Sequence, residues 1–196
     1  RIEEKAVQFT ESIEEFEDLV GLATALDGRP AAGRRLGAVT NAGFECVVMA
    51  DTLGPFTLAP LTDATRAALR DLLERTRLAG IVDVHNPLDL TPMAGDAAYE
   101  EAVRLVLADD GVDLAVIACV PLSAALKTSA GEIDDPDGLA ERLLRLHAAS
   151  PKPWVAVIDG GPLFDPLARK LAARGIPTFR SADRALRALG RWASGA

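Results

Sequence analysis

The feature that most constrains the fold of this chain is a repeated alternation between short, nearly uninterrupted apolar runs and longer stretches of helical period. It extends from Leu36 to Ala196, with short connections between the two kinds of segment. Such alternation is typical of βαβ units, because parallel strands need crossover connections and are covered by helices on both faces. The sequence therefore predicts one α/β domain with a mostly parallel sheet of five or six strands and helices on both faces.

Five apolar runs are the clearest strand candidates, and a sixth is weaker because Pro55 and Pro60 bracket it. The five are residues 36–40, 81–84, 113–119, 154–158 and 177–180, and the sixth is residues 56–61. Helix starts are marked by Thr62 and Asp63, by Asp137 and Gly138, and by Ser181 to Asp183. These are residue types that cap or open helices, and apolar positions at helical spacing follow each of them.

The first 33 residues differ from the rest of the chain. Ser12 followed by Glu15 forms a capping box before a helical apolar pattern. Residues 27–33 then read as a linker rich in Gly, Pro and Ala. We therefore expect residues 1–33 to be a helical connector and residues 34–196 to be the α/β domain.

Composition excludes several classes of function. The 196 residues are 49% hydrophobic and 26% charged, with a net charge of -8, which disfavours nucleic acid and anionic membranes as partners. The longest uncharged apolar run, residues 114–126, is too short to cross a bilayer, for which about 20 residues are needed.

Cys46 and Cys119 lack metal or disulfide spacing, so we expect no metal site and a cytoplasmic location. Because residue 1 is Arg, we also expect the chain to be a piece of a longer polypeptide.

The turn after the first strand candidate is the leading candidate binding site. Asn41, Ala42, Gly43 and Phe44 lie where the carboxyl end of a strand meets the start of a helix. Ligands of open α/β sheets gather at that edge, and unpaired N–H groups at a helix start bind anions. The alternative is a tight turn without a ligand. Glu45 favours this alternative, because a carboxylate in the first turn already compensates the positive end of the helix dipole.

Two other loops supply possible cleft residues. Asn86 and Asp89 lie in a polar stretch after the strand expected at 81–84, and Gly160 and Gly161 follow the strand expected at 154–158. Asp89 has two interpretations: a base or ligand, or a hydrogen-bond anchor for its loop.

Three further side chains have a chemical interpretation and a structural one. His85 is either an acid–base group or a loop residue, because no nucleophile or carboxylate is spaced around it. Cys46 is either a thiol activated by a helix N-terminus or a small buried hydrophobe. His147, beside leucines, is expected to be structural.

The order of these motifs resembles that of the NDP-forming acyl-CoA synthetases, the family of the ADP-forming acetate–CoA ligases. The resemblance covers about residues 36–194. The motifs that carry it are GAVTNAG at 37–43, AD at 50–51, NPLDLT at 86–91, YEEA at 99–102, VD at 112–113, PWVAV at 153–157, GG at 160–161, Leu171, GIP at 175–177 and ADRA at 182–185. The matching part of that family is its C-terminal succinyl-CoA-synthetase-like domain, which implies a three-layer flavodoxin-like fold. The predicted connector also resembles the segment that precedes this domain.

The resemblance implies a function for the complete protein. Such enzymes convert acyl-CoA, NDP and phosphate to the acid, CoA and NTP through a phosphohistidine. They use CoA and ATP or ADP with Mg, and the partners implied are CoA-binding and phosphohistidine domains and an ATP-grasp domain or subunit; an oligomer is also possible. The resemblance assigns no catalytic residue and no bound cofactor to this fragment, but it assigns a phosphate-binding role to Asn41, Ala42, Gly43 and Phe44. The family commonly has a second glycine where this chain has Phe44.

Two hypotheses from different classes follow. In the first, the chain is an accessory domain of an NDP-forming acyl-CoA synthetase and contributes a helix N-terminus to the phosphate site. In the second, it is a non-catalytic flavodoxin-like module for assembly or small-molecule sensing.

Overall fold

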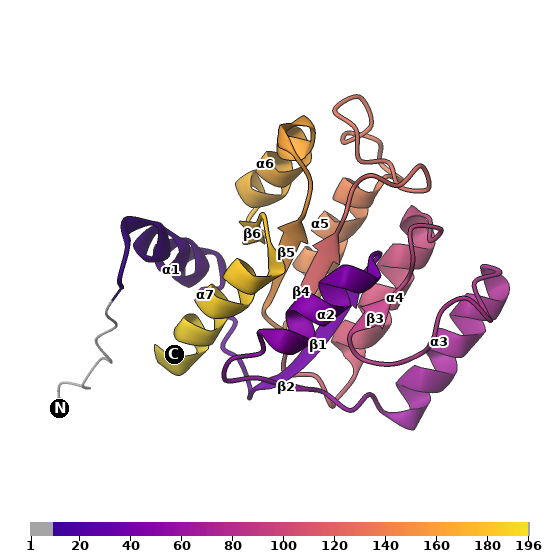
Figure 1. Cartoon of the computed structure of the whole chain (residues 1–196), viewed down its shortest axis with the longest axis horizontal. Helices are drawn as coiled ribbons and strands as arrows, with labels where there is room; N and C mark the ends of the chain where they lie inside the picture. Colours follow the sequence, from indigo (N-terminus) through magenta and orange to yellow (C-terminus); the bar gives the residue numbers. More distant parts are fainter. Residues whose placement is uncertain (1–9, 196) are drawn as a thin grey trace.

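Every strand pair in the sheet is parallel, and helices cover both faces of the sheet (Figure 1). The computed structural model describes residues 10–195. The strands are β1 (Arg35–Thr40), β2 (Thr57–Leu58), β3 (Leu88–Asp89), β4 (Leu114–Cys119), β5 (Trp154–Ile158) and β6 (Thr178–Phe179). Across the sheet their order is β2-β1-β4-β5-β6, and β3 also pairs with β1. The predicted α/β fold is therefore confirmed.

Two layers of helices enclose the sheet. The helices are α1 (Ile13–Ala25), α2 (Gly43–Asp51), α3 (Asp63–Arg75), α4 (Asp96–Ala108), α5 (Leu139–Ala149), α6 (Asp165–Ala173) and α7 (Ala182–Gly195), with a 3-10 turn, η1, at Pro162–Phe164. Leu114 and Val116 of β4 pack with α1, α2 and α7, whereas Ala115 and Ile117 pack with α3 to α6. Both faces of β4 are thus buried, which explains its continuous apolar sequence.

The prediction of a strand at residues 81–84 was wrong. After α3 the chain passes through turns, and the N–H of Val82 donates to the carbonyl of Leu78 at 3.1 Å. Val82 is buried among the helices while Ile81 is exposed, so this apolar run supplies core contacts without joining the sheet. The place beside the end of β1 is taken by β3, which the sequence analysis placed in a loop.

The strands expected at residues 56–61 and 177–180 do form, but each has only two residues. Pro60 cannot donate a hydrogen bond to a neighbouring strand, so β2 ends early. The carbonyl of Pro177 still accepts from the N–H of Ala156 at 2.8 Å, which extends the contact of β6 with β5 by one hydrogen bond.

Asn86 completes the sheet between β2 and β3. Its Nδ2 donates to the carbonyls of Leu36 at 2.7 Å and Ala59 at 3.0 Å. Its Oδ1 accepts from the N–H of Ala38 at 2.9 Å. Since β2 and β3 flank the same side of β1 at different heights, the amide replaces the strand hydrogen bonds that neither of them makes.

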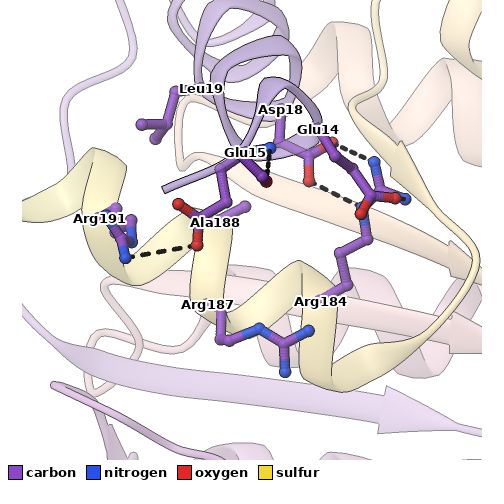
Figure 2. Close-up of a pocket in the computed structure, with 9 residues that line it drawn as sticks. Glu14, Glu15, Asp18, Leu19, Arg184, Arg187, Ala188 and Arg191 are labelled. Atoms are coloured by element: carbon purple, nitrogen blue, oxygen red, sulfur yellow. Dashed lines mark hydrogen bonds and ion pairs between the residues drawn. The ribbon is translucent and has the colours of Figure 1, made fainter. Parts of the chain in front are cut away.

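Helix α1 lies against α7 through charged and apolar contacts. Figure 2 shows Arg184 and Arg191 of α7 pointing toward acidic side chains of α1. Arg184 donates to both carboxylate oxygens of Asp18 at 2.7 and 2.8 Å, and Arg191 lies 3.3 Å from Glu15. Leu22 is buried in the same layer as the sheet-facing side of α7. A small cavity of about 160 Å³ remains between the two helices.

The predicted capping box forms only in part. The Ser12 hydroxyl accepts from the N–H of Glu15 at 3.1 Å, but the Glu15 carboxylate accepts from the N–H of Glu11 at 2.8 Å and not from that of Ser12. Residues 1–9 of the predicted connector lie outside the described part of the chain. The division at residue 33 into connector and domain stays a prediction. None of the helices between residues 10 and 195 has the length and apolar content needed to span a membrane.

Candidate functional site

Helix α2 begins at the carboxyl end of β1 and leaves two backbone donors free. Ala42 caps the helix with an extended backbone, at φ -149° and ψ 121°, and no side chain accepts from the first turn. The N–H of Glu45 donates to the carbonyl of Ala42 at 3.0 Å. Within residues 10–195, no hydrogen-bond acceptor partners the N–H groups of Gly43 and Phe44. Free N–H groups and the positive end of a helix dipole together favour an anion.

Asn41 holds this turn in place. It is buried, its Nδ2 donates to the carbonyl of Val120 at 2.9 Å, and its Oδ1 accepts from the N–H of the same residue at 2.8 Å. The N–H of Ala42 donates to the Thr40 hydroxyl at 3.2 Å. The Asn41 amide therefore ties the end of β1 to the chain just beyond β4, and it positions the helix start without facing a ligand.

A carboxylate already stands beside the free donors. A Cβ added at Gly43 would lie 3.2 Å from Oδ2 of Asp89, the last residue of β3, which pairs with Thr40 of β1. The other oxygen, Oδ1, accepts from the N–H of Thr91 at 2.8 Å and so anchors the loop. Asp89 thus acts as a loop anchor and also places negative charge beside the start of α2.

Asn86 and His85 lie apart from this turn. Asn86 bonds to the backbone near the start of β1, whereas Gly43 follows the end of that strand. Both side chains line a separate cavity of about 360 Å³ beside β2, together with Arg66. The structure therefore brings Asp89, but not Asn86, to the start of α2.

Gly160 and Gly161 lie in the loop between the end of β5 and η1. Arg180 donates to both of their carbonyls, to that of Gly161 at 3.1 Å. A Cβ at Gly160 would lie 2.8 Å from the Phe164 ring and 2.9 Å from Pro121, so only glycine fits this close approach. No atom lies within 4 Å of a Cβ at Gly161. The first glycine is needed for packing, and the second has open space.

A buried carboxyl group in the first turn of α2 is the residue whose environment the sequence analysis missed. Glu45 is only 1% exposed, and its Oε2 has no hydrogen-bond partner. Burial raises the pKa of Glu45 to about 8, and the nearby carboxylates of Asp159 and Asp183 raise it further in the same direction. Glu45 was recognised in the sequence only as a charge near the helix dipole. Nothing in the sequence shows that three carboxyl groups so far apart in the chain meet.

The two thiols are not activated. Burial raises the pKa of Cys46 to about 11, and the charges of Asp89 and Glu45 act in the same direction. Burial also raises the pKa of Cys119. Both thiols are protonated near neutral pH, so the effect of the helix N-terminus on Cys46 is overcome by desolvation.

His147 lies in the core, where its ring meets the Trp154 ring edge-on at 5.3 Å. Burial, followed by the charge of Arg29, lowers its pKa to about 4. The ring of His147 is therefore neutral at physiological pH, and it packs in the core as the sequence analysis predicts for a structural histidine.

Between residues 10 and 195 no three His, Cys, Asp or Glu side chains are grouped so that they could hold a metal ion. The donors that remain at the candidate site are the backbone N–H groups of Gly43 and Phe44. Fold and site together define a three-layer, flavodoxin-like α/β domain with a helix N-terminus open at the carboxyl edge of its sheet.

Comparisons with known proteins agree with this fold class and identify enzymes that the chain resembles. No family model matches the chain. The alpha subunit of acetate–CoA ligase [ADP-forming] II from Pyrococcus furiosus is 28% identical over 168 residues, which are 84% of this chain and 34% of that subunit. The alpha subunit of acetate–CoA ligase [ADP-forming] I from the same organism is 36% identical over 107 residues, which are 53% of this chain and 21% of that subunit. The chain thus spans about a third or less of the curated relatives it matches.

Solved structures share the fold over nearly the whole chain. PH0766 from Pyrococcus horikoshii OT3 matches with a TM-score of 0.77 and 26% identity, over 96% of this chain and 42% of that protein. The apo dinucleotide forming acetyl-coenzyme A synthetase 1 of Ca. Korarchaeum cryptofilum matches with a TM-score of 0.76 and 23% identity, over 96% of this chain and 39% of that one. The resemblance to the NDP-forming acyl-CoA synthetases is therefore confirmed, with the ADP-forming acetate–CoA ligase alpha subunits as its named relatives.

Proposed function

We propose that this chain is a domain of an NDP-forming acyl-CoA synthetase and contributes the N-terminus of α2 to the phosphate site of the complete enzyme. The observation that carries the proposal is the pair of unpartnered N–H groups of Gly43 and Phe44 at the carboxyl edge of the sheet. The similarity to alpha subunits of ADP-forming acetate–CoA ligases supports it. A related Korarchaeum synthetase was solved with phosphate and ADP.

In this proposal the chain positions an anion and does not carry the chemistry. Gly43 and Phe44 donate hydrogen bonds, Asn41 holds their turn against β4, and Ala42 leaves the helix start uncapped. CoA, ATP or ADP, and Mg belong to other parts of the complete enzyme, as do the CoA-binding, phosphohistidine and ATP-grasp units. An anion held only by one helix end is bound weakly, so the facing parts of the enzyme complete the site.

The proposal is tested by Gly43→Val in the complete enzyme. A β-branched side chain would crowd Asp89 and cover the approach to the free N–H groups. Because loss of one preorganised donor typically lowers turnover about a hundredfold or more, we expect a fall of that order in kcat. The matched control is Gly21→Val in α1, where a Cβ meets nothing within 4 Å. Unchanged turnover of Gly43→Val beside an active control would contradict the phosphate-site role.

The chain by itself is expected to form no acyl-CoA, because it would supply neither the phosphohistidine nor the nucleotide and CoA sites. The measurement is nucleotide-dependent acyl-CoA formation by the purified 196-residue chain. Turnover above background would show that the chemistry resides in this chain.

A second candidate function is a non-catalytic module for assembly or small-molecule sensing. One observation favours it: Asp89 and Glu45 already place carboxyl groups around the start of α2, and Phe44 stands 53% exposed beside the free donors. In that case Gly43→Val would leave the activity of the complete protein unchanged and alter only its assembly or its response to a small molecule.

A further inference from the structure

The carboxyl group of Glu45 lies behind the candidate anion site and is cut off from water. It belongs to the first turn of α2, one residue after the two free donors, and its Oε2 is both buried and without a partner. Asp159, directly after β5, interacts with it, and Asp183 at the start of α7 lies close enough to raise its pKa. Helices α2 and α7 pack in the same layer, with Glu45 in the first turn of one and Asp183 in the first turn of the other.

Protonation of Glu45 would allow its buried carboxyl group to donate a hydrogen bond. An ionised Glu45 has no donor to offer to Asp159, so a buried carboxylate would face the half-buried carboxylate of Asp159 with Oε2 unsatisfied. A protonated Glu45 donates an O–H to the Asp159 carboxylate, which removes one charge and satisfies one buried atom. Carboxyl pairs of this kind hold one proton between them because both cannot ionise cheaply.

The other charged and titratable groups facing Glu45 do not supply a compensating positive charge. Asp183 of α7 is engaged by the Ser181 hydroxyl at 2.5 Å and by Arg187 at 2.7 Å. The Tyr99 hydroxyl of α4 donates to the carbonyl of Ala118 at 2.5 Å, and its pKa is raised well above the usual value by burial. Cys46 of α2, whose thiol is protonated near neutral pH, also interacts with Glu45, and Asp89 lies beside Gly43 at the start of the same helix.

We propose that Glu45 and Asp159 share one proton behind the α2 N-terminus, and that loss of this proton weakens anion binding by Gly43 and Phe44. The proposal rests on the proposed anion-binding role of that turn and adds its regulation. In the neutral form of Glu45, the positive end of α2 is left to attract an anion. When the proton leaves to water, a negative charge appears within the first turn and opposes the ligand through a medium of low dielectric.

The first test uses the unaltered 196-residue chain and sulfate as the probe. Sulfate keeps the same charge between pH 6 and 9, so any change in affinity reports on the protein. Binding is followed by the amide NMR signals of Gly43 and Phe44, and the Glu45 carboxyl carbon is titrated with and without sulfate. We expect the Kd for sulfate to rise about fivefold from pH 6 to pH 9 and to approach a roughly tenfold rise at still higher pH. By linkage, saturating sulfate then raises the pKa of Glu45 by about one unit.

Variants separate the proton pair from the anion site. Glu45→Gln keeps the shape, cannot ionise, and is expected to bind sulfate with an affinity independent of pH. Asp159→Asn removes the proton acceptor and is expected to reduce the pH dependence by lowering the pKa of Glu45. The control is Asp63→Asn, which removes an exposed first-turn carboxylate from α3 that pairs with Arg66, and it should keep the pH dependence of the unaltered chain.

The outcomes distinguish this proposal from the proposed function. Sulfate binding that is lost in Gly43→Val, but keeps its full pH dependence in Glu45→Gln, would overturn the role of the carboxyl pair and leave the anion site standing. Absence of sulfate binding to the unaltered chain and to Glu45→Gln at every pH would overturn the proposal of the carboxyl pair, whereas unchanged turnover of Gly43→Val in the complete enzyme would overturn the proposed function. A Glu45 pKa that does not move on addition of saturating sulfate would also contradict the proposal.

Discussion

Replacing Glu45 by Gln should make the protein more stable at alkaline pH and leave its stability almost unchanged at acid pH. The reason is that burial and the carboxylates of Asp159 and Asp183 raise the pKa of Glu45 in the folded state from 4.5 to about 8. The folded protein therefore holds a proton that the unfolded chain has released. Stability from this proton is complete below about pH 4.5 and is lost as the pH rises through about 8.

The size of the effect follows from the shift in pKa. At about 1.4 kcal/mol per unit, the shift sets an upper limit of roughly 5 kcal/mol on the stability lost at alkaline pH. Glutamine keeps a buried polar group that must still find partners, so we expect the gain for Glu45→Gln at pH 9 to be about 2–3 kcal/mol.

The measurement is urea unfolding of both proteins at pH 5.5 and pH 9, with the free energy of unfolding compared at each pH. Asp63→Asn is the control, since the exposed Asp63 side chain pairs with Arg66 on the surface and should give a difference that does not depend on pH. A difference between Glu45→Gln and the unaltered protein that is the same at both pH values would refute the reasoning.

Three other substitutions test the packing around the site. Asn41→Ala should cost about 2–3 kcal/mol in urea unfolding, because it leaves both backbone groups of Val120 without the partners they have now; a cost below 0.5 kcal/mol would contradict this. Gly160→Ala should cost about 1–3 kcal/mol through overpacking, whereas Gly161→Ala should lie within about 0.5 kcal/mol of the unaltered protein, and equal values would count against the contact geometry. The unaltered protein should lose up to about 3 kcal/mol of its free energy of unfolding as the pH falls from 6.5 toward 4, because the folded state favours the neutral His147 ring. His147→Phe should not show this loss, and parallel pH profiles of the two proteins would disprove the explanation.

The alternation of apolar runs was sufficient to predict the sheet, because β4 and β5 are buried along their whole length and their sequences are continuously apolar. It failed at residues 81–84, where an equally apolar run packs among helices without pairing. Periodicity measures burial, and a short buried run can be coil as well as strand. The strand at Leu88–Asp89 could not be predicted, because it lies in a polar segment and two residues are too few to show a hydrophobic pattern.

The candidate site was located from the turn Asn41 to Phe44, but the roles within it were not. The resemblance assigned Asn41 a phosphate-binding role, and in the structure its amide bonds to the backbone of Val120. The pKa of Glu45 is raised in part by Asp183 of α7, which lies more than a hundred residues further along the chain. Tertiary contacts of this kind leave no trace in local spacing, so only the fold shows them.

The central claim is that the free N–H groups at the start of α2 hold phosphate in the complete enzyme. The most direct test is a crystal structure of that enzyme with bound phosphate. The claim predicts phosphate oxygens about 3 Å from the backbone nitrogens of Gly43 and Phe44, with the Phe44 ring turned away from the anion. Phosphate bound elsewhere, with these two N–H groups covered by the Phe44 ring or capped by Asp89, would contradict it.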